Sequence, residues 1–420
     1  MLRSVDLHYG DGLTFDWTYD PDRMLSVFRA PPPSDHPADL IRQALRNPLE
    51  LPPLDQFFVP GDKVTLALDR RTPQADLVVK ELVGTLLSCG VEPATMTVLQ
   101  PAVLEAEPVI DPRRLLPPDV QRDMRHVIHD PTDQKAQGYL ASTSRGMRVY
   151  LARDLLDADV VLSVGWIGYD QQLGFRGTGS VFYPGLSSVE AFTKTQGQGH
   201  AELGPEDERP LRQEIDEIAW LLGNLFTLQV MPSRSGGVAQ AWAGAGDAVL
   251  KKGRQYLHDH WRVAADRRAD LVVVAIEQDA AGHGWSQLGA ALATARNLVC
   301  RGGKIVVLSE LSAPLGRGLE MVRSCDNLRT VLQQLNQAHP LDLLPATQLA
   351  RAADWARVYL LSRMEPSIVE DLFLVPLSNE RELERALKDE GSTIAVESAQ
   401  HTFAEILVSE NDRSTTPPVR

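Results

Sequence analysis

The stretch DVVLSVGWIGYDQQLGFRGTGS, residues 159–180, decides how this chain folds. Its first part, 160–164, is apolar except for one serine, which is typical of a buried strand. Past Gly165 the composition changes to glycines, amides, the carboxylate of Asp170 and the guanidinium of Arg176. Ligands of parallel α/β sheets bind beyond the carboxyl ends of the strands. The stretch is therefore a candidate site, and an ordinary glycine-rich connection is the alternative.

The segment before this stretch contains a βαβ unit. Residues 64–68 form an apolar strand that ends at Asp69, residues 74–89 carry a helical apolar pattern that stops at Gly90, and residues 95–99 form the next strand. A crossover of this kind makes the two strands parallel. We therefore expect a parallel-sheet domain over residues 60–200, with Asp69 and Asp170 at the same strand-end edge.

A second α/β pattern begins near residue 266. Strands are predicted at 270–275, 305–308 and 357–361, with a helix at 285–299. The fold class is therefore α/β, with two α/β domains that contain parallel-type sheets. The expected divisions are an N-terminal domain over 1–265, a C-terminal domain over 266–408, and a polar, disordered tail over 409–420.

Composition narrows the classes of partner. The chain has 420 residues and a net charge of -14, which argues against nucleic acid and against anionic membrane surfaces. No apolar run approaches the ~18 residues needed to cross a bilayer. The N-terminus lacks a signal-peptide core, and the three scattered cysteines are expected to be reduced thiols, which is typical of a cytoplasmic protein. The sequence does not indicate an oligomeric state.

A small anion remains a plausible partner, because a local basic site can overcome a diffuse negative field. Arg71, Arg145 and Arg176 lie on three loops that the βαβ arrangement is expected to bring to one edge. Their planar guanidinium groups suit carboxylate or phosphate. The alternative is that each arginine pairs with a nearby carboxylate of the chain, such as Asp69, Asp130 or Asp170.

The ordered set of motifs over residues 60–200 resembles the nickel-dependent lactate racemase family. The matching stretches are Leu68-Asp69 through Thr72-Pro73, His129-Asp130, Thr143-Ser144-Arg145-Gly146, Ala158-Asp159-Val160-Val161, Gly174-Phe175, Gly177, Pro184-Gly185 and Ser188. This resemblance implies a site in an interdomain cleft, and an enzyme that interconverts 2-hydroxy acid enantiomers. It also implies a nickel-pincer nucleotide that accepts and returns a hydride. The positions that would meet the cofactor are Asp69, Arg71, Thr72, Arg176, Gly177, Ser180, Pro184 and Gln196.

The sequence departs from the family at its chemical positions. Asp170 stands where the family has a histidine, Ser180 where a lysine tethers the cofactor, and Gln196 where a histidine binds nickel. No histidine falls at 103–105, and Ala290 stands at a substrate-side lysine. A hydroxyl cannot supply the amine of the tether, and an amide is a poor nickel ligand.

Three residues are candidates for the missing acid–base chemistry. Asp170 could act if burial raised its pKa. His200 lies four residues after Gln196, which is one turn if the segment is helical, and His283 follows the strand 270–275. The alternative for each histidine is a surface or capping role.

Two functions remain open from the sequence. The first is a divergent racemase or epimerase of a small 2-hydroxy acid, with an altered nickel-pincer site. The second is a non-catalytic or repurposed homologue that binds a small anionic ligand or a partner.

Overall fold

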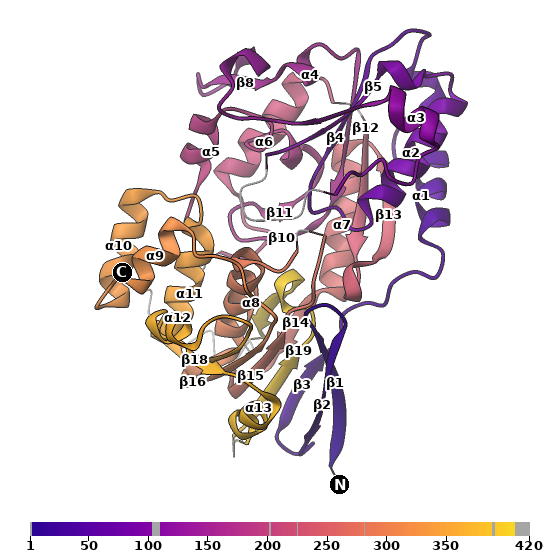
Figure 1. Cartoon of the computed structure of the whole chain (residues 1–420). Coiled ribbons are helices and arrows are strands. Elements are labelled where there is room, and N and C mark those ends of the chain that lie inside the picture. The colour runs from indigo at the N-terminus through magenta and orange to yellow at the C-terminus, as the bar shows by residue number, and fades with distance from the viewer. Residues whose placement is uncertain are drawn as a thin grey trace. The chain divides into compact units, whose positions relative to one another are not determined.

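The computed structural model describes residues 2–102, 110–200, 203–224, 226–280, 282–388 and 391–407. The chain divides into two compact units (Figure 1). The N-terminal unit consists of Pro31–His258 and Asp279–Gly282, and the C-terminal unit consists of Met1–Ala30, Asp259–Gln278 and His283–Arg420. Within the described ranges, no helix has both the length and the apolar character needed to cross a membrane.

A six-stranded sheet forms the centre of the N-terminal unit. Its order is β13-β12-β9-β4-β5-β6, and every neighbouring pair is parallel except β12 and β13. The strands are β4 (Val64–Leu68), β5 (Met96–Gln100), β6 (Arg125–Ile128), β9 (Val160–Trp166), β12 (Phe226–Pro232) and β13 (Val238–Gly244). All five residues of β4 are buried, as expected for a central parallel strand covered on both faces.

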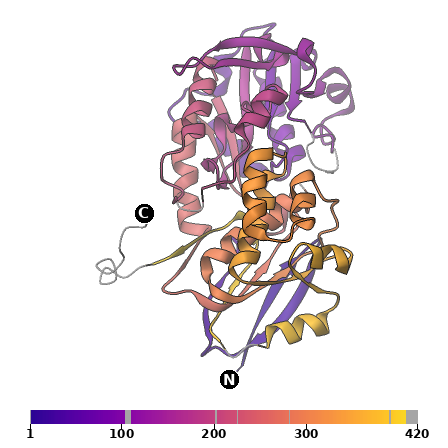
Figure 2. The ribbon, with the colours of Figure 1, turned by 90° about the vertical axis from the view of Figure 1, so that its left-hand side faces the viewer.

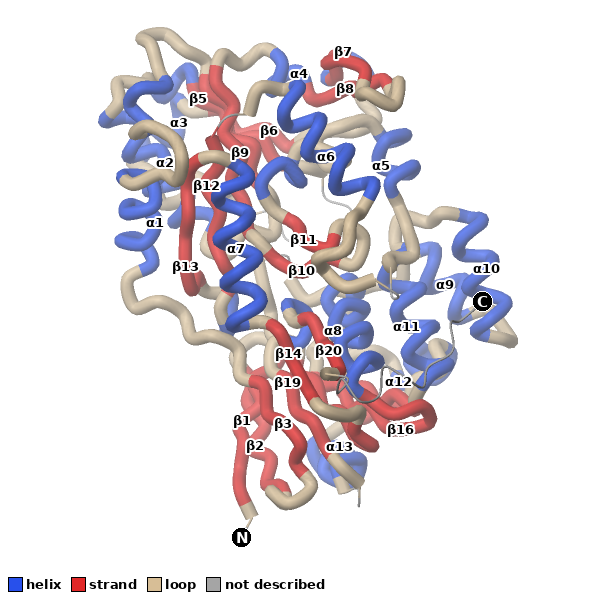
Figure 3. Tube along the Cα trace, turned by 180° about the vertical axis from the view of Figure 1, so that it is seen from behind, coloured by secondary structure: helices blue, strands red, loops and turns tan. Residues whose placement is uncertain are grey.

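Helices cover both faces of this sheet (Figure 3). On one face, α1 (Pro37–Arg46) and α2 (Ala75–Ser88) bury their apolar sides against alternate residues of β4, β9 and β12. On the other face lie α6 (Pro210–Leu221) and the short 3-10 turn η4 (Thr178–Val181). The unit also contains α3 (Pro118–Asp123), α4 (Arg153–Leu156), α5 (Val189–Thr195) and most of α7 (Gly246–His260).

Two small hairpins complete the N-terminal unit. One pairs β7 (Gln137–Ser142) with β8 (Arg148–Ala152). The other pairs β10 (Gly168–Asp170) with β11 (Gly174–Arg176) inside the glycine-rich stretch that follows β9. That stretch was expected to be a loop, and the hairpin fixes where its charged residues lie.

The C-terminal unit has its own six-stranded sheet, which is parallel throughout. The order is β18-β17-β16-β15-β19-β3, with β3 (Met24–Phe28), β15 (Ala269–Ala275), β16 (Val299–Leu308), β17 (Arg357–Leu361), β18 (Val375–Leu377) and β19 (Thr393–Val396). A separate parallel pair joins β14 (Arg262–Ala265) to β20 (Phe403–Ile406). The helices are α8 (Trp285–Leu298), α9 (Arg317–Arg323), α10 (Leu328–Ala338), α11 (Leu343–Trp355), α12 (Pro366–Asp371) and α13 (Glu380–Leu387).

The first thirty residues belong to the C-terminal unit, which corrects the expected boundary at residue 1. β1 (Arg3–Tyr9) and β2 (Leu13–Tyr19) form an antiparallel hairpin, and β3 pairs with β19. Val5, Leu7, Phe15 and Trp17 pack against alternate residues of β15 and β16. Figure 2 shows this indigo hairpin beside the strands of the same unit. The expected tail, 409–420, lies outside the described residues.

Most predicted elements are present close to their predicted bounds. The βαβ unit is confirmed, because β4 and β5 are parallel and joined by α2. Residues 3–19 form an antiparallel hairpin. The helix α6 begins at Pro210, where a proline occupies the first helical turn.

We expect Leu7→Ala to lower the free energy of unfolding by about 2–5 kcal/mol, because Leu7 is fully buried in the hairpin's contact with the sheet. Leu13→Ala is the matched control, since Leu13 lies on the same hairpin and is 40% exposed. Urea unfolding followed by circular dichroism measures both variants. Equal costs for the two substitutions would contradict the docking of this hairpin.

Candidate ligand-binding site at the carboxyl end of the N-terminal sheet

The order of strands in the N-terminal sheet reverses between β4 and β9. From β4 the chain continues outward through β5 and β6, and then returns to the other side of β4 to form β9 and β12. Loops that leave two such strands diverge and open a crevice at their carboxyl ends, which is where open α/β sheets bind ligands. Asp69 follows β4 at this point, and the β10–β11 hairpin follows β9. Asp69 and Asp170 thus lie at the same edge of the sheet, as predicted.

Asp69 is held tightly by its own loop. Its N–H donates to the carbonyl of Val164 on β9 at 2.9 Å. Its side chain accepts the N–H of Arg71 at 2.9 Å, and its carbonyl accepts the Thr72 hydroxyl at 2.6 Å. Thr72 is completely buried, so its role is to close this turn. The loop therefore presents the Asp69 carboxylate in a fixed position.

An ion pair joins the two sides of the switch point. Arg176 Nη2 lies 2.9 Å from Asp69 Oδ2, and both side chains are largely buried. The guanidinium carbon of Arg176 also lies 4.8 Å from the centre of the Trp166 ring. Arg176 pairs with Gly168 at the base of the β10–β11 hairpin, next to the sheet. Of the alternatives for the arginines, pairing with a carboxylate of the chain is what Arg176 does.

Two glycines make room beside this ion pair. A Cβ added to Gly165 would lie 3.3 Å from the Asp69 Cβ and 3.2 Å from Gln229 Oε1. Gly177 has a φ of 125°, and an added Cβ there would lie 2.9 Å from Ile167 Cγ1. Only glycine adopts this conformation at low cost. The hairpin can therefore approach the end of β9 closely only because residue 177 is glycine.

Gln229 is a site residue that the sequence analysis missed. It lies on β12 next to Gly165, is 1% exposed, and donates through Nε2 to Thr227 Oγ1 at 2.7 Å. Thr227 Oγ1 must accept this bond, because its own hydrogen is directed at the Ser163 carbonyl. The Gln229 Oε1 atom is buried without a hydrogen-bond partner among the described residues. The sequence does carry a sign of this residue. Thr227 and Gln229 are polar, lie two residues apart and so face the same side of an otherwise apolar strand.

Arg212 is a second residue that sequence reasoning did not identify. It lies in the first turn of α6, is 6% exposed, and pairs with Asp216. Its guanidinium donates to the carbonyl of Gly177 at 3.1 Å and to the Thr178 hydroxyl at 3.0 Å. Arg212 thus fixes the segment that carries Arg176.

Three of the predicted cofactor positions have structural partners. Ser180 Oγ accepts the N–H of Gly177 at 2.9 Å and so closes the η4 turn. Pro184 follows a cis peptide bond, and its carbonyl accepts the N–H of Ser187. Gln196 ends α5, with extended backbone angles.

The prediction that His200 could lie one helical turn after Gln196 is wrong, because α5 ends at Thr195. The His200 side chain is exposed. The backbone N–H of His200 donates to the carbonyl of Gln171 at 3.0 Å. Asp170 lies in the same neighbourhood, at the tip of the β10–β11 hairpin. Its Oδ1 accepts the N–H groups of Gln172 and Leu173 at 2.8 and 3.0 Å. Asp170 therefore stabilises the turn that faces the His200 segment.

Arg145 and His283 each have partners other than Asp69 and Arg176. Arg145 is exposed on the β7–β8 turn and donates to Gln213 of α6 at 3.3 Å. His283 belongs to the C-terminal unit. Its Nε2 accepts the N–H of Glu310 at 3.1 Å and lies 2.7 Å from the Ser309 hydroxyl. An Nε2 that accepts a backbone N–H carries no proton, so this histidine caps the end of β16 in its neutral form.

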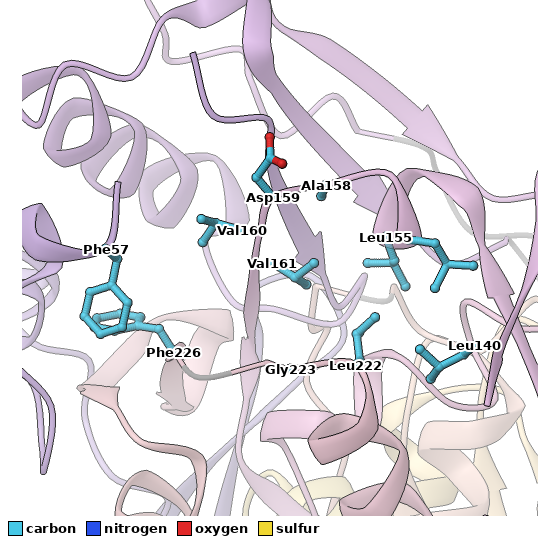
Figure 4. A pocket seen from close by; sticks show the side chains of 11 residues that line it. Phe57, Leu140, Leu155, Ala158, Asp159, Val160, Val161, Leu222, Gly223 and Phe226 are labelled. Carbon is cyan, nitrogen blue, oxygen red and sulfur yellow. The ribbon is translucent and has the colours of Figure 1, made fainter. Parts of the chain in front are cut away.

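An apolar pocket of about 320 Å³ lies at the opposite end of the N-terminal sheet (Figure 4). It surrounds the amino ends of β9 and β12, and Phe57, Leu155 and Phe226 are among its lining residues. The one carboxylate that lines it, Asp159, accepts the N–H of Lys63 at 2.9 Å. Asp159 is the one lining residue with a polar side chain, so the candidate site remains the switch point around Asp69.

We expect Gly177→Ala to cost about 1–3 kcal/mol more stability than Gly146→Ala, because only the former adds a steric clash to a strained backbone. Gly146 also has a positive φ, of 79°, but an added Cβ there meets nothing within 4 Å. Thermal or urea unfolding of the two variants gives the difference directly. Equal costs would mean that the hairpin does not approach β9 as closely as described.

Comparison with known proteins finds one matching family model and several similar solved structures. Residues 9–200 match the model of the lactate racemase N-terminal domain. Among solved structures, the lactate racemase apoprotein from Thermoanaerobacterium thermosaccharolyticum is similar, with a TM-score of 0.80 and 17% identity, over 96% of this chain and 100% of that one. A structural-genomics protein from Thermotoga maritima matches with a TM-score of 0.67 and 14% identity, over 89% and 100% of the two chains. No curated protein matches the sequence. Residues 9–200 therefore match a lactate racemase N-terminal domain, and the chain shares the fold of the lactate racemase apoprotein.

Proposed function

We propose that this protein binds a small 2-hydroxy acid at the switch point of its N-terminal sheet, as a divergent homologue without the family's tethered nickel-pincer chemistry. The observation that carries the proposal is the Asp69–Arg176 ion pair, which holds a guanidinium at the edge where α/β sheets bind ligands. The carboxylate of the acid would share Arg176 with Asp69.

Two unsatisfied polar atoms support this choice of ligand. Among the described residues, Arg176 Nε and Gln229 Oε1 are both buried without a hydrogen-bond partner. Buried polar groups without a partner cost about 1–3 kcal/mol each, so a ligand that satisfies them is favoured. One atom is a donor and the other an acceptor. A 2-hydroxy acid offers the matching pair, because its carboxylate accepts from Arg176 and its hydroxyl donates to Gln229.

The local charge also favours an anion. Asp69, Arg70, Arg71 and Arg176 together carry a net charge of two positive units, in a chain whose total is -14. A guanidinium binds a carboxylate through two parallel N–H···O bonds, which gives geometric selectivity as well as energy.

The nickel-pincer nucleotide that the family resemblance implies does not fit the donors at these positions. The Ser180 hydroxyl supplies no amine for the tether and already accepts the Gly177 N–H. Gln196 offers an amide where a nickel ligand is expected, and nickel favours imidazole. The described residues contain no group of three or more His, Cys, Asp or Glu side chains that could hold a metal. The proposed function therefore does not depend on this cofactor.

Racemase or epimerase activity on the bound acid is the alternative that the family suggests. It needs a group that removes the proton or hydride from the carbon that bears the hydroxyl. Asp170 is the residue nearest the family's catalytic position, but both its N–H contacts belong to its own turn. Binding, rather than isomerisation, is the function that this geometry supports best.

Two substitutions separate the proposed contacts. We expect Arg176→Ala to weaken the binding of both lactate and propionate by about 1.5–3 kcal/mol, the usual contribution of a charged hydrogen bond. We expect Gln229→Met to weaken the binding of lactate by about 0.5–1.5 kcal/mol. The same substitution should leave the binding of propionate unchanged, because propionate lacks the hydroxyl. Isothermal titration calorimetry measures both ligands.

Arg145→Ala is the matched control for these titrations, since Arg145 is exposed and contacts only the surface of α6. Circular dichroism establishes that each variant is folded before titration. If wild-type protein binds neither lactate nor propionate, the proposal fails, and Asp69 and Arg176 have a structural role alone.

We also expect no covalent cofactor on this chain. When the protein is produced together with the enzymes that synthesise the pincer nucleotide, its intact mass should equal that of protein produced without them. Peptide mapping should find residues 177–194 unmodified, including Lys194, the lysine nearest to Ser180 in the sequence. A cofactor mass on that peptide would contradict the absence of a tether.

A further inference from the structure

Three arginines of the C-terminal unit converge on one tryptophan ring. The guanidinium carbons of Arg268, Arg296 and Arg301 lie 5.1, 5.1 and 5.4 Å from the centre of the Trp355 ring. We call these four residues the arginine–tryptophan cluster. Their positive charges lie within about 10 Å of one another, which is the screening length at 0.1 M salt, so they repel each other.

The fold brings these residues together from four places in the sequence. Arg296 is in the last turn of α8, and Trp355 is the last residue of α11. The two helices pack closely at Gly289 of α8. A Cβ added to Gly289 would lie only 2.9 Å from the Pro345 Cα of α11. Arg268 directly precedes β15, and Arg301 lies near the start of β16. The cluster therefore sits at the amino-terminal edge of the C-terminal sheet.

Among the described residues, little carboxylate charge lies beside the three guanidinium groups. None of the three forms an ion pair with an Asp or Glu among the residues that the structure describes. Asp354 acts on Arg296 and also pairs with Arg329 at 3.5 Å. Burial lowers the pKa of Arg296, the nearby charges of Arg351 and Arg268 lower it further, and the charge of Asp354 offsets part of this effect. The charged form of Arg296 is therefore disfavoured by its surroundings.

A purely structural role accounts for only part of this arrangement. Arg268 donates to the carbonyls of Arg296 and Val299 at 3.3 Å. It thereby supplies hydrogen bonds to carbonyl groups at the carboxyl end of α8. The carboxyl ends of α8 and α11 contribute roughly half a negative charge each. That total of about one unit is much smaller than the charge of the arginines. In addition, Arg296 Nε is buried without a hydrogen-bond partner among the described residues.

We infer that the arginine–tryptophan cluster binds a multiply charged phosphate group, of the diphosphate or triphosphate class. A single carboxylate would neutralise one of the three charges, whereas a diphosphate or triphosphate neutralises two or more. An arginine stacked on an aromatic ring keeps its N–H groups at the edge of the guanidinium plane, where they can bind phosphate oxygens. This site is separate from the lactate site proposed above, because all its residues belong to the C-terminal unit.

The test is calorimetric titration of the full chain with tripolyphosphate at low salt. We expect Arg301→Gln and Arg296→Gln each to weaken binding by about tenfold or more, the effect of losing one charged hydrogen bond. Arg301 is exposed, so its replacement keeps the test valid even if Arg296→Gln fails to fold. Arg381→Gln is the matched control, since Arg381 is an exposed arginine of α13 in the same unit.

A parallel titration with adenosine triphosphate distinguishes the source of the phosphate. Equal affinities for the two compounds would assign recognition to the phosphate chain, and tighter binding of the nucleotide would add its nucleoside. Arg176→Ala should leave both affinities unchanged, which separates this site from the Asp69 site. The inference is overturned if wild-type protein does not bind tripolyphosphate at millimolar concentration, if Arg381→Gln weakens binding as much as Arg301→Gln, or if an aspartate-rich peptide binds the cluster and tripolyphosphate does not.

Discussion

The ion pair between Asp69 and Arg176 is the interaction on which the site of the N-terminal unit depends. It joins the end of β4 to the hairpin that follows β9, across the point where the order of strands reverses. Both side chains are largely buried, so each charge is stabilised mainly by the opposite charge of its partner. Removing one partner of such a pair leaves an uncompensated charge, which is far more costly than the pair is stabilising. The two loops are therefore fixed relative to each other by electrostatics as well as by packing.

Several features of the local sequence serve this ion pair. Glycine at 165 lets Asp69 and Gln229 pack closely against the end of β9, and glycine at 177 lets the hairpin turn back over β9. Arg212 of α6 holds the carbonyl of Gly177 in place. Ser180 closes the adjacent turn with a hydroxyl, which is a role that a lysine could not fill in the same way. The local structure around residue 180 thus uses the serine hydroxyl.

The sequence predicts the parts of the fold that depend on local pattern. The apolar run of β4, the stop at Gly90 and the following strand were enough to establish a parallel βαβ unit, and Asp69 and Asp170 were placed at the correct edge. Contacts between distant residues were not predictable. Leu7 packs on β15, more than 250 residues away, so the first thirty residues were assigned to the wrong unit.

The site shows the same division between local and distant information. Arg176 was identified because it lies among glycines after a strand. Gln229 and Arg212 were missed, because neither has a motif of its own and each reaches the site only through the packing of β12 and α6. His200 was placed on a helix by counting four residues from Gln196, but the helix had already ended at Thr195. Spacing in sequence gives the direction of a side chain only while the secondary structure continues.

The account depends on energetic coupling between Asp69 and Arg176, which a double-mutant cycle measures directly. The free energy of unfolding is determined for the wild type, Asp69→Asn, Arg176→Gln and the double variant. The account predicts a coupling of at least about 1 kcal/mol, with the double variant more stable than the sum of the single effects implies. A coupling indistinguishable from zero would mean that the two charges do not interact, and would contradict the site described for this protein.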